Sequence, residues 1–155
     1  MIIKISDVKA LEDKKILATP NFIQQKTNFE LALTDNDIDK VIFKHQEIPA
    51  HIIEEIAKNV NRNDFIAQYY IDNIKTLGKT IIFLDRWYQC KMVEDYINKK
   101  TGKEIAASIF SYTDTNKNID YINNRSSNQN EINLERFRNG EIEVLINVKM
   151  LTEGV

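Results

Sequence analysis

Cysteine and histidine are scarce in this chain. Cys90 is its one cysteine among 155 residues, so no internal disulfide can form. That composition fits a reducing compartment, and a cytoplasmic protein is expected. The two histidines, His45 and His51, have no partners at the spacing of metal ligands. A zinc site is therefore not expected.

Long apolar runs and a basic excess are also missing. No stretch approaches the roughly 18 apolar residues that suggest a membrane span. The first residues, MIIKISD, have the wrong order of charge and apolar residues for a signal peptide, so no membrane partner is expected. The net charge of -2 does not fit a protein that coats nucleic acid by charge alone. Any contact with nucleic acid must come from a local surface.

Glycine is scarce as well, with four in the chain. None belongs to the phosphate-binding pattern G-x-x-x-x-G-K-[ST]. Residues 77–80, LGKT, contain Gly-Lys-Thr but precede a predicted strand, which favours a helix stop followed by a strand start. No G-x-S-x-G nucleophile motif is present either. The chain assembles no complete catalytic site, and no catalytic residue is predicted.

The second half of the chain has a clear α/β rhythm. Continuous apolar runs indicate buried strands, and the segments between them have helical spacing and end at glycine. The predicted strands are residues 80–84, 105–112 and 143–148, and the predicted helices are 87–99 and 128–139. Strand, helix, strand, helix, strand at this spacing predicts a parallel sheet. A polar stretch at 113–130 is predicted to be a loop.

The first half is less regular. Residues 1–60 are predicted to be a lead-in of mixed strand and helix. Its expected elements are strands at 2–5 and 22–33, a helix at 7–13 capped by Ser6, a helix from Thr34 or Asp35 to about His45, and a helix begun by Pro49. A further helix is predicted over 62–75, with Phe65, Ile66, Tyr69, Tyr70 and Ile74 as its apolar face.

Two segments of the second half carry a family resemblance. Residues 78–83, GKTIIF, resemble motif IV of superfamily 2 helicases. Residues 137–155, FRNGEIEVLINVKMLTEGV, resemble the helix, strand and motif V of the second RecA-like domain, most closely in the DEAD/DEAH-box branch near restriction and defence helicases. Residues 15–22 and 61–64 are similar to family segments outside these motifs. The resemblance implies a parallel-sheet RecA-like C-terminal lobe over 61–155.

The resemblance also implies a division of labour. Family motors bind ATP and Mg²⁺ between two RecA-like domains, mainly through the first, and DNA or RNA lies across both. This sequence stops before the aspartate and the arginine motif that follow motif V in the family, and it lacks the first domain's motifs. We therefore expect a truncated fragment of a helicase or translocase, without catalysis of its own, whose partners are nucleic acid and a first RecA-like domain. An unpaired sheet edge is expected too.

Motif V supplies most of the candidate binding residues. The resemblance implies that Asn147, Lys149 and Thr152 contact the phosphate backbone, and that Glu153 and Gly154 lie at the ATP-binding cleft. Simpler interpretations stay open, because Asn147 can end a strand, Lys149 can be solvated and Gly154 can serve a turn.

The ends of the other two strands give further candidates. Arg86 and Ser111 follow predicted strands and can meet nucleic acid, or they can start a helix and cap a strand. Trp87 and Tyr88 can stack on a base or pack in the core. A second hypothesis for the whole chain is a non-catalytic α/β interaction module, since a doubly wound pattern does not fix function.

Overall fold

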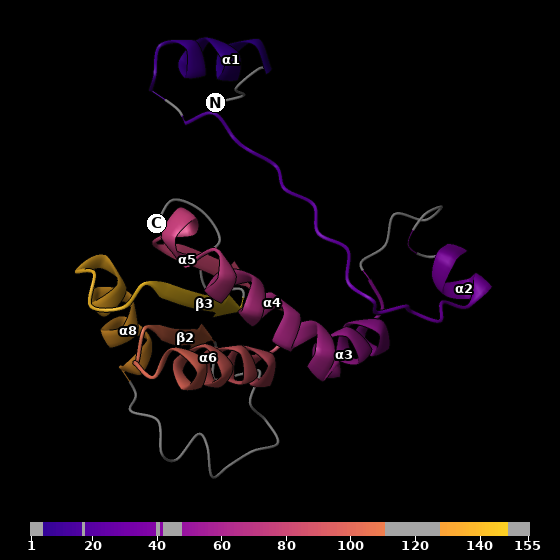
Figure 1. Ribbon diagram of the computed structural model, residues 1–155. Coiled ribbons are helices and arrows are strands. Elements are labelled where there is room, and N and C mark those ends of the chain that lie inside the picture. Colours follow the sequence, from indigo (N-terminus) through magenta and orange to yellow (C-terminus); the bar gives the residue numbers. More distant parts are fainter. Residues whose placement is uncertain (1–4, 17, 40, 42–47, 111–127, 149–155) are drawn as a thin grey trace.

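The computed structural model confirms an α/β chain with a parallel sheet (Figure 1). It describes residues 5–16, 18–39, 41, 48–110 and 128–148. Within them, three strands pair in the order β1-β3-β2. The strands are β1 (Thr80–Phe83), β2 (Ala106–Phe110) and β3 (Val144–Val148), and both pairings are parallel. All three lie inside the ranges that the apolar runs predict.

Two helices form the connections between these strands. α6 (Trp87–Thr101) joins β1 to β2, and α8 (Gln129–Arg138) lies between β2 and β3. Gly102 ends α6 at φ 67°, a left-handed conformation that favours glycine. The predicted loop at 113–130 falls largely outside the described residues.

β3 is the centre of the core. All five of its residues are buried, as a strand covered on both faces requires. α6 and α4 (Val60–Asp72) cover one face of the sheet through Cys90, Val93 and Tyr70. α8 covers the other face through Phe137, whereas Ile132 on the same helix is 39% exposed.

β1 departs from the prediction that both of its faces are covered. Ile82 packs against the core, but Ile81 is 38% exposed and Phe83 is 64% exposed. The reason is position: β1 is an edge strand, and α8 contacts β2 and β3 instead. A continuous apolar run thus forms a strand that is buried on one face only among the described residues.

The lead-in is less strand-like than predicted. α1 (Ile5–Asp13) is helical from Ile5, so Ser6 lies within the helix, and residues 1–4 lie outside the described part. The strand predicted at 22–33 is wrong, because that segment is extended but pairs with no strand, and its Phe22 is 90% exposed. In Figure 1 the segment connects α1 to the rest of the molecule.

The two later helices of the lead-in start where the sequence predicts. Thr34 caps α2 (Asp35–Ile38) in a capping box with Asp37, and Pro49 is the N-cap of α3 (Ala50–Lys58). The predicted extension of the first of these helices to His45 lies partly outside the described residues, at 40 and 42–47.

The helix predicted over 62–75 is two helices. α4 begins at Val60, because Asn59 is its N-cap. The side chain of Asn59 accepts a hydrogen bond from the N–H of Arg62 at 2.8 Å. α5 (Ile74–Leu77) follows after Asn73 and ends at Gly78. The inward face also differs from the prediction, since Ala67 and Asn63 are buried while Phe65 is 37% exposed.

The described helices include none with the length and apolar character to cross a membrane.

Candidate nucleic-acid interface at the carboxyl end of the sheet

The strands of the two segments that resemble motif IV and motif V lie next to each other. In the parallel register Phe83 of β1 is opposite Asn147 of β3, and the N–H of Leu84 donates to the carbonyl of Asn147 at 3.0 Å. Arg86 follows as the N-cap of α6. Two of the predicted site residues, Arg86 and Asn147, thus lie at the same end of the sheet, where its parallel strands have their carboxyl ends. Ligands of open α/β sheets usually bind at this end.

Arg86 is held by a carboxylate from the lead-in. Its Nε lies 2.6 Å from Oε1 of Glu54 on α3, and its Nη1 donates to the carbonyl of Asp85 at 3.1 Å. The arginine side chain is 21% exposed and that of Glu54 is 37% exposed. The cation therefore stays at the surface in one orientation, with part of its charge neutralised by Glu54.

Tyr88 completes this contact, which we call the Arg86 latch (Glu54, Arg86, Tyr88). The hydroxyl of Tyr88 donates to Oε2 of Glu54 at 2.7 Å. Hydrogen bonds from Arg86 and then from Tyr88 hold the pKa of Glu54 below its usual range. Burial, followed by the hydrogen bond to Glu54, raises the pKa of Tyr88 to about 12. All three groups thus keep their ordinary neutral-pH charges, with Glu54 ionised.

The described structure favours the plainer interpretation of Asn147. Its side chain is fully buried in β3, at 0% exposure. In this conformation Asn147 does not reach solvent, so it acts as part of the strand end. The core interpretation is likewise favoured for Trp87, which is partly buried against the core cluster and meets the rings of Tyr88 and Phe110. Cys90 is buried as a small apolar side chain.

The remaining predicted site residues lie outside the described part of the chain. They are Ser111, Lys149, Thr152, Glu153 and Gly154.

A chain of buried side-chain amides, which we call the amide relay, lies beneath the surface next to the site. The sequence did not predict it. The N–H of Asp85 donates to Oε1 of Gln89 at 3.2 Å, and Nε2 of Gln89 donates to Oδ1 of Asn63 at 2.9 Å. Nδ2 of Asn63 then donates to the carbonyl of Ala57 at 2.9 Å. Gln89 is 0% exposed and Asn63 is 1% exposed. The relay ties the loop after β1 to the end of α3, the helix that carries Glu54.

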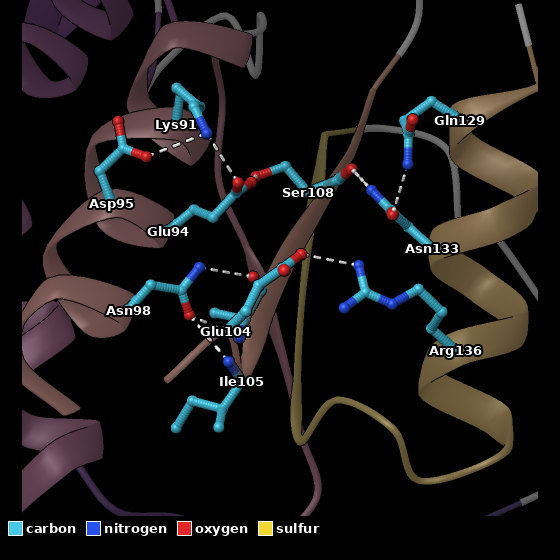
Figure 2. Close-up of polar contacts among 11 residues, drawn as sticks. Lys91, Glu94, Asp95, Asn98, Glu104, Ile105, Ser108, Gln129, Asn133 and Arg136 are labelled. Atoms are coloured by element: carbon cyan, nitrogen blue, oxygen red, sulfur yellow. Dashed lines mark hydrogen bonds and ion pairs between the residues drawn. The ribbon is translucent and has the colours of Figure 1, made fainter. Parts of the chain in front are cut away.

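The outer edge of β2 is closed by asparagine side chains rather than by a strand (Figure 2). Nδ2 of Asn98 on α6 donates to the carbonyl of Ala106 at 2.9 Å. Its Oδ1 accepts from the N–H groups of Ile105 and Ala106, both at 2.9 Å. One side chain thus satisfies three backbone groups at the start of the edge strand.

α8 continues the closure along the same edge. Asn133 donates to the carbonyl of Ser108 at 2.9 Å. Asn130 donates to the carbonyl of Phe110 at 2.8 Å and accepts from its N–H at 3.3 Å. The expected unpaired edge is therefore not β2. On the opposite edge, the described residues place no strand beside β1.

A serine–carboxylate contact on β2 is structural. Oγ of Ser108 donates to Oε2 of Glu94 at 2.5 Å, and Lys91 lies 2.7 Å from Oε1 of the same carboxylate (Figure 2). Ser108 is 0% exposed, so its hydroxyl has no access to a substrate. The contact joins α6 to β2 and indicates no nucleophile.

Replacing Glu54 with glutamine tests the energy of the Arg86 latch. We expect the free energy of unfolding at pH 7 to fall by about 0.5–1 kcal/mol, a value kept small by the exposure of both side chains. Because folding lowers the pKa of Glu54, its contribution is present above the usual value of 4.5 and is lost as pH falls through the lowered pKa. Urea unfolding of both proteins between pH 7 and about pH 3 measures this, and the two curves should converge at the acid end.

The control for that experiment is Glu55→Gln, on the same helix and exposed. It removes the same charge without touching Arg86. If the two substitutions lower stability equally at pH 7, the latch contributes nothing beyond net charge.

The described residues contain no group of three or more side chains suited to a metal ion. Comparison with protein-family models, with curated proteins and with solved structures finds no match to this chain.

Proposed function

We propose that this chain is the second, RecA-like lobe of an ATP-dependent helicase or translocase. The observation that carries the proposal is the pairing of β1 with β3. The segments that resemble motif IV and motif V contain neighbouring parallel strands, so the carboxyl ends of both strands lie at the same end of the sheet. A lobe that contacts nucleic acid with both motifs requires that adjacency.

In this proposal the lobe contributes binding surface rather than a complete reaction centre. ATP and Mg²⁺ are held mainly by the first lobe, which supplies the phosphate-binding loop. The 155 residues contain no such motif, and Gly78 and Lys79 lead into β1, which begins at Thr80, rather than following a strand. Glu153 and Gly154 remain the proposed contacts of this chain at the nucleotide cleft, by resemblance to motif V.

Arg86 is the described residue best placed for nucleic acid. It stands at the surface beside the ends of β1 and β3, and Glu54 fixes the direction of its guanidinium. A cation held in this way suits a backbone phosphate, which fixes the position of a strand without reading its sequence. DNA and RNA both offer that group.

Binding of single strands tests the proposal. We expect the chain to bind fluorescein-labelled oligothymidylate or oligouridylate at low salt, with an affinity that falls as salt rises. Arg86→Gln and Lys149→Ala should each reduce the slope of log K against log salt by about 1, and Thr152→Ala should weaken binding with a smaller change of slope. Fluorescence anisotropy over a salt series gives both quantities.

The control is Arg138→Gln, an exposed arginine at the end of α8 away from the strand ends. Binding that falls equally in the control reflects net charge alone. ATP turnover by the chain on its own, abolished by a substitution within it, would overturn the division of labour between lobes.

The alternative is a non-catalytic α/β interaction module. The exposed face of β1 favours it, because Ile81 and Phe83 leave apolar surface there. The anisotropy titration described above distinguishes the two functions. An interaction module would show no salt-dependent binding of single strands, or binding that Arg86→Gln and Lys149→Ala leave unchanged.

A further inference from the structure

A polar cavity lies away from the strand ends, between the lead-in and the start of α4. It has a volume of about 300 Å³. One side is residues 27–30, and the other is Asn59, Asn61, Arg62 and Phe65. None of the residues of the Arg86 latch lines it. A volume of this size is at the lower end of small-molecule pockets and exceeds that of a single compact anion.

Arg62 is the unusual group in this cavity. Its Nη1 is buried and has no hydrogen-bond partner among the described residues. A guanidinium N–H withdrawn from water without an acceptor is unfavourable, so native structures usually provide one. Arg62 as a whole is partly exposed and lines the cavity, so a small rotation of its guanidinium brings this N–H within reach of an acceptor that enters from solvent.

The surroundings of Arg62 favour an anion as that acceptor. Thr27, Asn28 and Asn61 bring neutral groups that can donate hydrogen bonds. The 13-residue helix α4 begins at this wall, and the N-terminus of a helix favours negative charge. Among the described residues of the lining, the acidic side chain is Glu30, which is exposed and lies on the opposite wall, in the lead-in.

We propose that this cavity binds a phosphate group, with Arg62 as its main ligand. The planar guanidinium presents parallel N–H donors that match two phosphoryl oxygens. Free phosphate, a nucleotide and the backbone of a nucleic acid share that group. The site is independent of the proposed helicase function, since it uses neither the strand ends nor the motif V loop.

Isothermal titration of the full 155-residue chain with inorganic phosphate, at constant ionic strength in chloride, tests the proposal. We expect one saturable site that Arg62→Gln weakens about tenfold or more, as loss of a bidentate charged contact requires. Arg138→Gln is the matched control and should bind like the original chain. Glu30→Gln should bind phosphate more tightly, because it removes the carboxylate that the described residues contribute to the lining.

Competition then identifies the source of the phosphate. Displacement of inorganic phosphate by adenosine monophosphate but not by oligothymidylate indicates a nucleotide site, displacement by both indicates a site open to a nucleic-acid backbone, and displacement by neither indicates a free-anion site. Each of these supports phosphate recognition. The proposal is overturned if phosphate does not bind, or if Arg62→Gln and Arg138→Gln bind it equally. If Arg62→Gln does not fold, unchanged phosphate affinity in Glu30→Gln overturns it.

Discussion

Replacing Asn98 with alanine is expected to lower the free energy of unfolding by about 2–4 kcal/mol. The substitution removes three hydrogen bonds at once, to the carbonyl of Ala106 and to the N–H groups of Ile105 and Ala106. Ala106 is 1% exposed, so water does not simply replace the lost partners. Urea unfolding followed by circular dichroism measures the change.

Two further variants show whether the hydrogen bonds are the cause. Asn98→Asp keeps an acceptor for both N–H groups and loses the donor to Ala106, so its effect should be intermediate. Asn139→Ala removes an exposed amide at the end of α8 and should change stability by less than about 0.5 kcal/mol. Equal losses in Asn98→Ala and Asn139→Ala would show that the amides do not stabilise the β2 edge.

The asparagines also determine where the sheet can grow. Side chains of Asn98, Asn130 and Asn133 occupy the outward backbone groups of β2, so a further strand cannot pair there without displacing them. Within the described part of the chain no strand pairs with the outward side of β1. An additional strand, from this chain or a partner, is therefore expected at β1.

Much of the second half could be predicted because its signals are local. The apolar run of β3, the spacing of α6 and the stop at Gly102 each depend on neighbours in sequence. The predictions that proved wrong concern features that depend on partners distant in sequence. The segment at 22–33 alternates loosely, as a strand does, yet no strand lies beside it to pair. β1 has the apolar run of a covered strand, but its place at the edge is decided by the order β1-β3-β2.

Some features of the candidate site could be predicted from the sequence, and others could not. Arg86 and Asn147 lie at the same end of the sheet because the two segments that resemble helicase motifs contain neighbouring parallel strands. Glu54 was not predictable, because it lies 32 residues before Arg86 on a helix whose position no periodicity reports. Asn63 and Gln89 are polar residues on amphipathic helices, where sequence alone favours exposure, and only the packed structure shows both to be buried.

Replacing Gln89 with leucine is the second large effect that we expect. The leucine fills similar space but leaves the N–H of Asp85 and the Oδ1 of Asn63 without their partner. Because Asn63 and the Gln89 site are buried, the free energy of unfolding should fall by about 2–4 kcal/mol. Gln68→Leu, on the partly exposed face of α4, is the control and should cost less than about 1 kcal/mol.

The double variant Asn63→Leu, Gln89→Leu separates the relay from simple packing. Removing both polar partners leaves fewer unsatisfied groups than the two single losses imply, so the double variant should be more stable than their sum by about 1–2 kcal/mol. Strict additivity would mean that the amides stabilise the fold independently. A measured coupling has a consequence for the site, since the relay connects Ala57 at the end of α3 to Asp85, beside Arg86. The position of Glu54 opposite Arg86 would then be set by buried amides, because an ion pair exposed to water contributes too little to hold a helix in place.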